Sequence, residues 1–215
     1  MQIVGLYVSV PVASFKVPRA REYFETFPCP PPATVYGMLL SLVGEINRSV
    51  HKGVEIAIGM LSEPEKSLIL RTVWRIKRKK TALGTGKNKR PDYQEVLTNV
   101  HFAVWIRPGQ DVNKSFPLAK RIHQAVSNPS SITRFGGLSL GESTFLVDEV
   151  KFLEWKNLKC LKCRLLTLEN EGLLSLPIWP DHVGFFTRWG QYNLIDFDLS
   201  ENLPETAWTV IRPPE

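Results

Sequence analysis

The chain has 215 residues, of which 43% are hydrophobic, so it can bury the core of a complete domain without help from disulfides or metals. No apolar run approaches the roughly 20 residues that span a bilayer, and the start lacks the features of a secretory signal, so we expect a cytoplasmic protein with no membrane contact. The net charge of +6 comes from one segment: residues 66–91 hold ten bases and no acid, whereas the remaining 17 of the 27 bases face 21 acids.

The first third of the chain predicts a strand, a helix and a second strand. Apolar residues occupy both alternating sets over residues 3–10, which is typical of a strand covered in part on both faces. Apolar residues at helical spacing over 35–46 predict a helix, whose start tolerates Pro31 and Pro32 and whose end is marked by Asn47. Strict alternation over residues 54–60 predicts the next strand.

The predicted helix carries a stripe without bulky side chains. Gly37, Ser41 and Gly44 follow one another at spacings of four and three residues. Glycine lowers helix propensity, so the stripe indicates that another backbone or a ligand approaches closely there.

Two longer strands predict an antiparallel ribbon with a basic connection. Alternation over residues 68–76 gives one apolar-leaning face and places Arg71, Arg75 and Lys77 on the other, and residues 96–106 alternate in the same way. The connection from Arg78 to Glu95 is far longer than a hairpin turn, so we expect a projecting, mobile finger. The gathering of bases in this ribbon predicts contact with a polyanion, and the alternative is a charged loop exposed to water.

A second helix and a glycine-rich loop come next. Residues 118–126 have a helical apolar face, with Ser115 as the expected cap and Asn128 and Pro129 as the stop. The loop at residues 134–143 then leads to a strand at residues 145–152. The order strand, helix, strands, helix, strand is the ferredoxin-like βαββαβ plan with an extra strand or bend in its middle. Apolar runs at residues 161–168, 183–189 and 208–211 predict additional strands packed on this first unit.

The common catalytic and cofactor signatures are missing from the sequence. Residues 84–88 depart from a phosphate loop because Thr81 and Asn88 stand where Gly and Ser or Thr are required. Cys160 and Cys163 have no second Cys or His pair at zinc spacing, and the four histidines are scattered. We therefore expect no catalytic residue, no metal site and no cofactor. One alternative stays open, a metal-independent ribonuclease site built from His101 with a nearby lysine and tyrosine.

Several stretches of the sequence resemble a known family. Residues 14–23 and 26–39, followed by Gly44, are similar to the N-terminal signature of the CRISPR-associated RAMP subunit that caps the 5′ end of the guide RNA in type I Cascade complexes, the fifth Cas family. The loop at residues 138–143 resembles the glycine-rich loop of the same superfamily, and the basic finger resembles its β-hairpin thumb. Glu142 departs from the pattern, because many relatives have a basic residue there.

The resemblance implies a fold, a ligand and partners. The fold is α+β and modified ferredoxin-like (RRM/RAMP): residues 1–155 form the RAMP domain, with a basic β-hairpin thumb at about residues 77–97, and residues 156–215 form a small β-rich C-terminal extension. The ligand is the 5′ handle of the CRISPR RNA (crRNA). The protein neighbours are the Cascade backbone subunit and large subunit, and target DNA is reached indirectly through the complex. Two other functions stay open: the endoribonuclease that one subtype of this family uses to process repeat RNA, and a ferredoxin-like regulator that binds a small molecule.

The residues expected to bind RNA come from three parts of the chain. A single strand is held by cations along its phosphates and by flat side chains on which its bases stack. The first loop supplies cations and a tyrosine ring, the finger supplies most of the bases, and the glycine-rich loop offers an arginine and bare backbone N–H groups. The expected RNA-binding residues are Lys16, Arg19, Arg21, Tyr23, Arg75, Lys77, Arg78, Lys79, Lys80, Lys87, Lys89, Arg90, Arg134, Gly136, Gly137 and Gly141.

Overall fold

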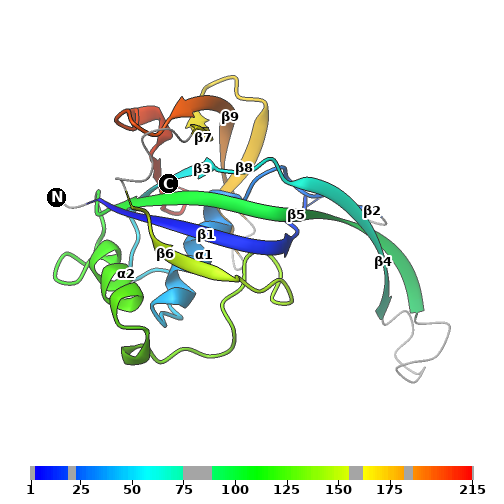
Figure 1. Cartoon of the computed structure of the whole chain (residues 1–215), viewed down its shortest axis with the longest axis horizontal. Coiled ribbons are helices and arrows are strands. Elements are labelled where there is room, and N and C mark those ends of the chain that lie inside the picture. The colour runs from blue at the N-terminus through cyan, green and yellow to red at the C-terminus, as the bar shows by residue number, and fades with distance from the viewer. Residues whose placement is uncertain (1–2, 19–22, 75–88, 155–161, 182–185, 215) are drawn as a thin grey trace.

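The computed structural model describes residues 3–18, 23–74, 89–154, 162–181 and 186–214, which form a mixed α/β fold (Figure 1). A sheet of ten strands dominates this part of the chain, antiparallel except where β2 pairs with β5. In chain order the elements are β1 (Val4–Ala13), β2 (Tyr23–Phe24), α1 (Pro32–Leu42), β3 (Glu55–Met60), β4 (Glu65–Trp74), β5 (Lys89–Arg107), α2 (Leu118–Ser127), β6 (Glu149–Phe152), β7 (Lys162–Leu168), β8 (Leu174–Trp179), β9 (Arg188–Asp198) and β10 (Thr209–Val210).

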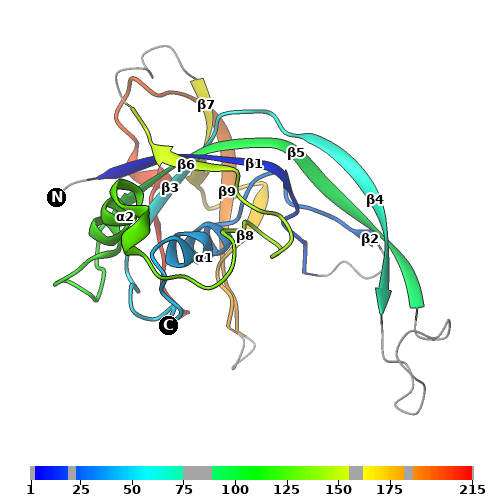
Figure 2. The same cartoon turned by 60° about the horizontal axis from the view of Figure 1, so that its bottom comes forward.

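The long strand β5 organises the sheet. The strands lie in the order β6-β1-β5-β3-β7-β9-β8, and β2, β4 and β10 pair outside this path. Along one edge of β5, residues 102–107 pair with β3, whereas residues 89–98 pair with β4. The change of partner falls at Asn99, whose φ of 58° is the one positive value of a non-glycine residue in the described part of the chain. From there the β4–β5 ribbon curves away from the body (Figures 1 and 2), and the expected antiparallel ribbon is confirmed. The predicted bounds of the connection are wrong, because residues 89–95 continue β5 and pair with β4.

The sheet has a core on each face. One core packs β1, β3 and β5 against α1 and α2, and it includes Leu6, Phe102 and Leu39. The other core lies on the opposite face, where Trp105 packs with Cys163 and with Trp208 from the C-terminal segment. The expectation that the first strand is covered in part on both faces is confirmed, because β1 contributes Leu6 to the first core and Tyr7 to the edge of the second.

The helix α1 begins as expected but ends earlier than the periodicity predicted. Pro31 precedes its first residue, Pro32. It stops at Leu42, because Gly44 adopts a φ of +68° and turns the chain out of the helix, so that Ile46 is left 98% exposed. The predicted close approach is confirmed at Gly44, where a Cβ would lie 2.3 Å from the backbone oxygen of Thr133, but it is wrong at Gly37, where a Cβ would have nothing within 4 Å in the described chain.

The expected cap of the second helix is wrong. No side chain caps α2 at its N-cap residue, Pro117. Instead the buried carboxylate of Asp111 accepts a hydrogen bond from the backbone N–H of Leu118 at 2.9 Å and also pairs with His51 at 2.9 Å. Asp111 thus takes the role expected of Ser115, from seven residues before the helix begins.

Several strands differ in extent from the prediction. β6 covers only residues 149–152, since residues 138–147 form a separate small hairpin that includes the bridge Ser139↔Leu146. The apolar side chains on one face of β4 are not packed into the body, because Leu68 and Leu70 are 48% and 62% exposed. The run at residues 161–168 matches β7, and the run at 208–211 contains β10. β9 starts at Arg188, near the end of the predicted run at 183–189, whereas β8 was missed.

The C-terminal strands continue the same sheet. β7 pairs with β3 through Gly59↔Leu165 and Met60↔Arg164, and β9 and β8 follow it outward. None of the helices in the described ranges is long and apolar enough to cross a membrane.

Candidate nucleic-acid interface

Three parts of the chain that sequence analysis assigned to RNA binding meet at the base of the β4–β5 ribbon. The first loop joins the ribbon through Ser14, whose Oγ donates to the backbone oxygen of Glu95 at 2.9 Å. The glycine-rich loop lies against the first loop, because a Cβ on Gly141 would be 2.4 Å from the Ser14 oxygen. Residues separated by more than a hundred positions therefore lie side by side.

In the first loop, Lys16 and Tyr23 present a cation and a ring. The loop returns on itself, with a bridge between Lys16 and Thr26, and the Lys16 Nζ lies 3.7 Å from the centroid of the Phe24 ring. Tyr23 is 43% exposed, and its hydroxyl donates to Glu95 at 3.0 Å. The predicted residues Arg19 and Arg21 lie outside the described residues.

Glu95 is the anchor of this surface. Its carboxylate accepts hydrogen bonds from the Tyr23 hydroxyl, from the Thr26 backbone N–H at 3.1 Å and from the Lys66 ammonium at 3.0 Å. Burial alone would raise the pKa of this carboxyl, but the donors, led by Lys66, hold its pKa below the ordinary value. The bond to Glu95 raises the pKa of Tyr23, so the phenol keeps its proton.

An apolar and aromatic strip crosses the ribbon at the same place. Tyr93 is paired with Leu70 on β4 and with Tyr23 on β2, so the three side chains stand side by side on one face of the sheet. They are 49%, 62% and 43% exposed in that order. Exposed rings next to cations are surfaces on which bases stack. Sequence analysis missed Tyr93, which only the register of β5 against β2 and β4 brings beside Tyr23.

The departure at Glu142 has a structural explanation. Its carboxylate accepts from Arg71 Nη1 at 3.0 Å and from Gln94 Nε2 at 2.8 Å, and Arg71 also donates to the buried Gln94 side chain. The acid thus fastens the glycine-rich loop to the ribbon. Glu142 serves as a tether between the two elements.

Backbone hydrogen bonds within the glycine-rich loop order one part of it, whereas another part has backbone N–H groups without acceptors in the described chain. Leu140 N–H donates to the Phe145 oxygen and Val147 N–H to the Leu138 oxygen, at 3.0 and 2.9 Å. In contrast, within the described chain no backbone N–H of residues 133–137 has an acceptor. Gly136 has a φ of +76° with nothing within 4 Å of a built Cβ, and Gly137 meets only the Leu146 side chain.

Two side chains flank these bare N–H groups. Arg134 is exposed, and Phe135 is 101% exposed, so its ring is fully accessible to solvent. Sequence analysis proposed Arg134, Gly136, Gly137 and Gly141 but missed Phe135. A free ring beside an arginine was the signal that could have found it.

Most of the basic finger lies outside the described residues. This holds for Arg75, Lys77, Arg78, Lys79, Lys80 and Lys87. Lys89 and Arg90 begin β5, where they pair with Trp74 and Val73 of β4. The described part of the ribbon ends at Trp74 and Lys89, away from the body (Figure 2).

A second polar cluster lies on the sheet face opposite the helices. The Tyr7 hydroxyl and His101 Nδ1 are 2.7 Å apart, and His101 Nε2 and Asn99 Oδ1 are 2.6 Å apart. Because the Asn99 oxygen can only accept, Nε2 carries the proton and Nδ1 accepts from Tyr7. The Lys151 Nζ lies 4.8 Å from the Tyr7 ring centroid and pairs with Glu149 at 3.0 Å. The tyrosine, histidine and lysine of the open alternative are thus together.

The two cysteines in the described ranges do not form a reactive site. Burial raises the pKa of both Cys29 and Cys163 to about 12, so neither thiol supplies a nucleophile near neutral pH. Within the described ranges no group of three or more His, Cys, Asp or Glu side chains could hold a metal ion.

Comparison with known proteins finds similar proteins both in sequence and in structure. Over 192 residues the chain is 41% identical to "CRISPR-associated protein Cas5" of Myxococcus xanthus (strain DK1622), covering 89% of this chain and 88% of that protein. A chain of a "CRISPR RNA-guided surveillance complex" has a TM-score of 0.65 at 15% identity, covering 91% of this chain and 90% of that one. A crystal structure described as a Cas protein has a TM-score of 0.52 at 12% identity, covering 91% and 94%. No protein-family model matches the chain.

Proposed function

The chain belongs to the Cas5 family of CRISPR-associated proteins, and on this premise we propose that it is a non-catalytic crRNA-binding subunit of a type I Cascade complex. In this role it grips the 5′ handle of the guide RNA, in antiviral defence or guided DNA targeting. It works in the cytoplasm and meets target DNA only through the complex.

The observation that carries this proposal is the meeting of the first loop, the ribbon and the glycine-rich loop. Lys16, Tyr23 and Tyr93 are exposed there, beside the start of a segment with ten bases and no acid. The bare N–H groups of residues 133–137 add anion donors from the backbone. Cations, rings and free N–H groups gathered around the base of the ribbon fit a single RNA strand better than a small molecule.

The strand order supports a modified ferredoxin-like fold with a thumb. The strands β6-β1-β5-β3, with α1 and α2 on one face, have the order of a βαββαβ unit into which β4 is added as the ribbon. In this proposal residues 1–155 form the RAMP domain, the thumb spans about residues 77–97, and residues 156–215 form the C-terminal extension that lengthens the sheet.

A second surface of the molecule supports the proposal that the chain binds protein neighbours. An apolar hollow beside the edge strand β8 is lined by side chains without charge, among which Leu173 is 91% and Trp189 41% exposed. A surface of this kind suits a protein subunit rather than RNA, because it offers nothing to phosphates. We assign it to a Cascade neighbour, the backbone subunit or the large subunit.

The decisive experiment is purification from cells that express the other Cascade subunits and a CRISPR array. The tagged chain should copurify with one RNA species about as long as a spacer plus repeat remnants. Leu173→Glu should lose the protein subunits while its melting temperature stays unchanged. Copurification of RNA of random length, or of none, would refute the proposed function.

A second candidate, the metal-independent endoribonuclease, is favoured by the cluster of Tyr7, His101 and Lys151. His101 can act as a base, and the ammonium of Lys151 can stabilise a developing charge on a phosphodiester. Under the first proposal, purified protein leaves repeat RNA intact in the presence of a chelator. A specific cut that His101→Ala abolishes would assign the chain to the second function.

A further inference from the structure

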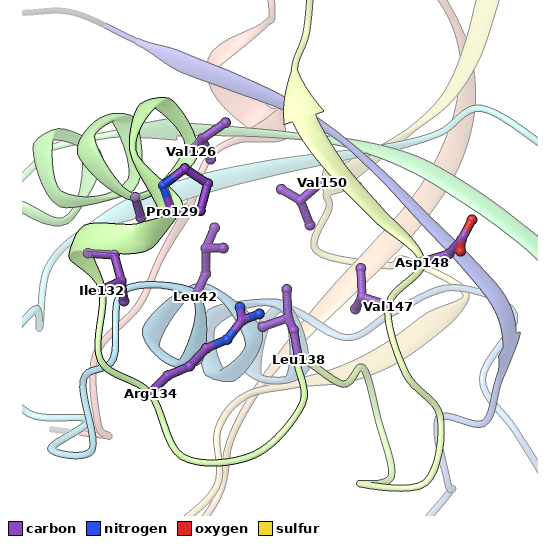
Figure 3. Close-up of a pocket in the computed structure, with 10 residues that line it drawn as sticks. Leu42, Val126, Pro129, Ile132, Arg134, Leu138, Val147, Asp148 and Val150 are labelled. Carbon is purple, nitrogen blue, oxygen red and sulfur yellow. The ribbon is translucent and has the colours of Figure 1, made fainter.

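A cavity lies between the C-terminal ends of α1 and α2, beside the glycine-rich loop. It has a volume of about 410 Å³ and is open to solvent on one side. Figure 3 shows the side chains that surround it. It is lined by Leu42, Ala125, Val126, Pro129, Ile132, Arg134, Leu138, Val147, Asp148 and Val150.

Arg134 is the cation among the residues that line this cavity. Its guanidinium points into the cavity between Leu138 and Leu42, whereas the carboxylate of Asp148 is turned away at the rim (Figure 3). Arg134 has no hydrogen-bond or ion-pair partner among the described residues. The aliphatic side chains around it offer no acceptors for its N–H donors, so a flat ligand that brings adjacent acceptors can bind them.

The residues that follow Arg134 in the chain indicate how the rest of a ligand would bind outside the cavity. The next residue, Phe135, offers a fully exposed ring, and Gly136 follows with open space above it. The N–H groups of residues 133–137 have no acceptors in the described chain. One phosphate on these N–H groups would let a strand place one base in the cavity and stack the next base on Phe135.

We propose that this cavity binds a single nucleobase turned out of the RNA strand, and that it prefers guanine to adenine. The proposal rests on the proposed RNA-binding function and adds a position at which the protein reads sequence. Guanine presents O6 and N7 as adjacent acceptors that an arginine can engage with two N–H groups. Adenine replaces one of these acceptors with an amino donor, which would face the guanidinium unfavourably.

The test compares short RNAs on the intact protein. The probe set is an oligouridine of about eight nucleotides and its variants with a single G or a single A at each position. We expect one position at which G binds the wild type about tenfold more tightly than A. Arg134→Lys keeps the charge but loses the paired donors, so it should remove this preference, and the readout is the ratio of the G and A affinities of the variant.

Two further variants make the result specific. Val150→Phe fills the cavity from β6 and should also abolish the preference, with its melting temperature measured to show that it folds. Lys162→Gln, on β7, removes one charge far from the loop and should retain the preference. If Val150→Phe unfolds the protein, Val126→Met fills the cavity from α2 and replaces it.

The outcomes separate this proposal from the proposed function. Tight oligouridine binding with G and A equal at every position would overturn the base pocket and leave RNA binding standing. A preference that survives Arg134→Lys would do the same. Loss of protein subunits from Val150→Phe with its preference intact would assign the cavity to a protein neighbour and overturn the proposal. Absence of any RNA binding by the wild type would refute both proposals.

Discussion

Alanine at Gly141 should destabilise the protein more than alanine at Gly136, although both glycines have a left-handed backbone in the same loop. Their φ values are +85° and +76°. A side chain in this conformation costs about 1–2 kcal/mol, and at Gly136 this is the whole effect, because a Cβ there has nothing within 4 Å. At Gly141 the Cβ would lie 2.4 Å from the Ser14 oxygen, so the loop must separate from Ser14.

That separation has a further cost. Ser14 donates to the backbone of Glu95, and weakening this buried bond adds about 1 kcal/mol. We therefore expect a loss of about 3 kcal/mol for Gly141→Ala and about 1–2 kcal/mol for Gly136→Ala in the free energy of unfolding. Urea denaturation of both variants and the wild type, followed by circular dichroism, measures the difference. Equal losses within about 0.5 kcal/mol would refute the contact between the glycine-rich loop and the first loop.

Two other predictions concern buried polar groups. Because the folded pKa of Glu95 is lowered, its stabilisation is complete above the ordinary value of 4.5 and is lost as the pH falls through the folded pKa. Glu95→Gln should therefore lose less stability between pH 6 and pH 3 than the wild type, and equal losses in urea titrations at both pH values would count against the Lys66 pair. Asp111→Ala leaves the buried His51 and a helix N–H without their acceptor, so it should cost about 3 kcal/mol, whereas the exposed control Glu201→Ala should stay within about 0.5 kcal/mol. Similar melting temperatures for the Asp111 and Glu201 variants would show that Asp111 is not the cap of α2.

The strands and helices whose apolar residues recur at a regular period could be predicted from the sequence. Alternation located β1, β3 and β5, and helical spacing located α1 and α2. The extent of each element depended on contacts between distant residues. α1 ends where Gly44 meets Thr133, and α2 is capped by Asp111 in place of Ser115.

The exposure of one face of the ribbon and the presence of the strand β8 could not be predicted from the sequence, for different reasons. Leu68 and Leu70 alternate like core residues, and only the position of β4 beyond the body leaves them exposed. β8 contains Pro177, which removes a backbone donor and hid the strand, although its place at the edge of the sheet tolerates proline.

The sequence predicted the chemical types of side chain in the candidate site better than it predicted which residues form the site. Lys16, Tyr23 and the glycine-rich loop came from charge, aromatic content and glycine spacing, and the structure brings them together. Tyr93 could not be identified without the strand register, and Glu142 could not be given its tethering role before its bonds to Arg71 and Gln94 were seen.

The salt dependence of RNA binding tests the central claim, that the basic finger grips the RNA, most directly. The variant has glutamine in place of Lys79, Lys80, Lys87, Lys89 and Arg90. The matched control has glutamine in place of Lys52, Lys114, Lys120, Lys162 and Arg164 on the body of the protein. The account predicts that the log–log slope of affinity against salt shrinks by up to about 0.7 for each lost phosphate contact, or roughly 3.5 for the five, in the finger variant alone. The finger variant should also fail to join the assembly while its melting temperature stays near that of the wild type. An unchanged slope together with normal assembly would contradict the account.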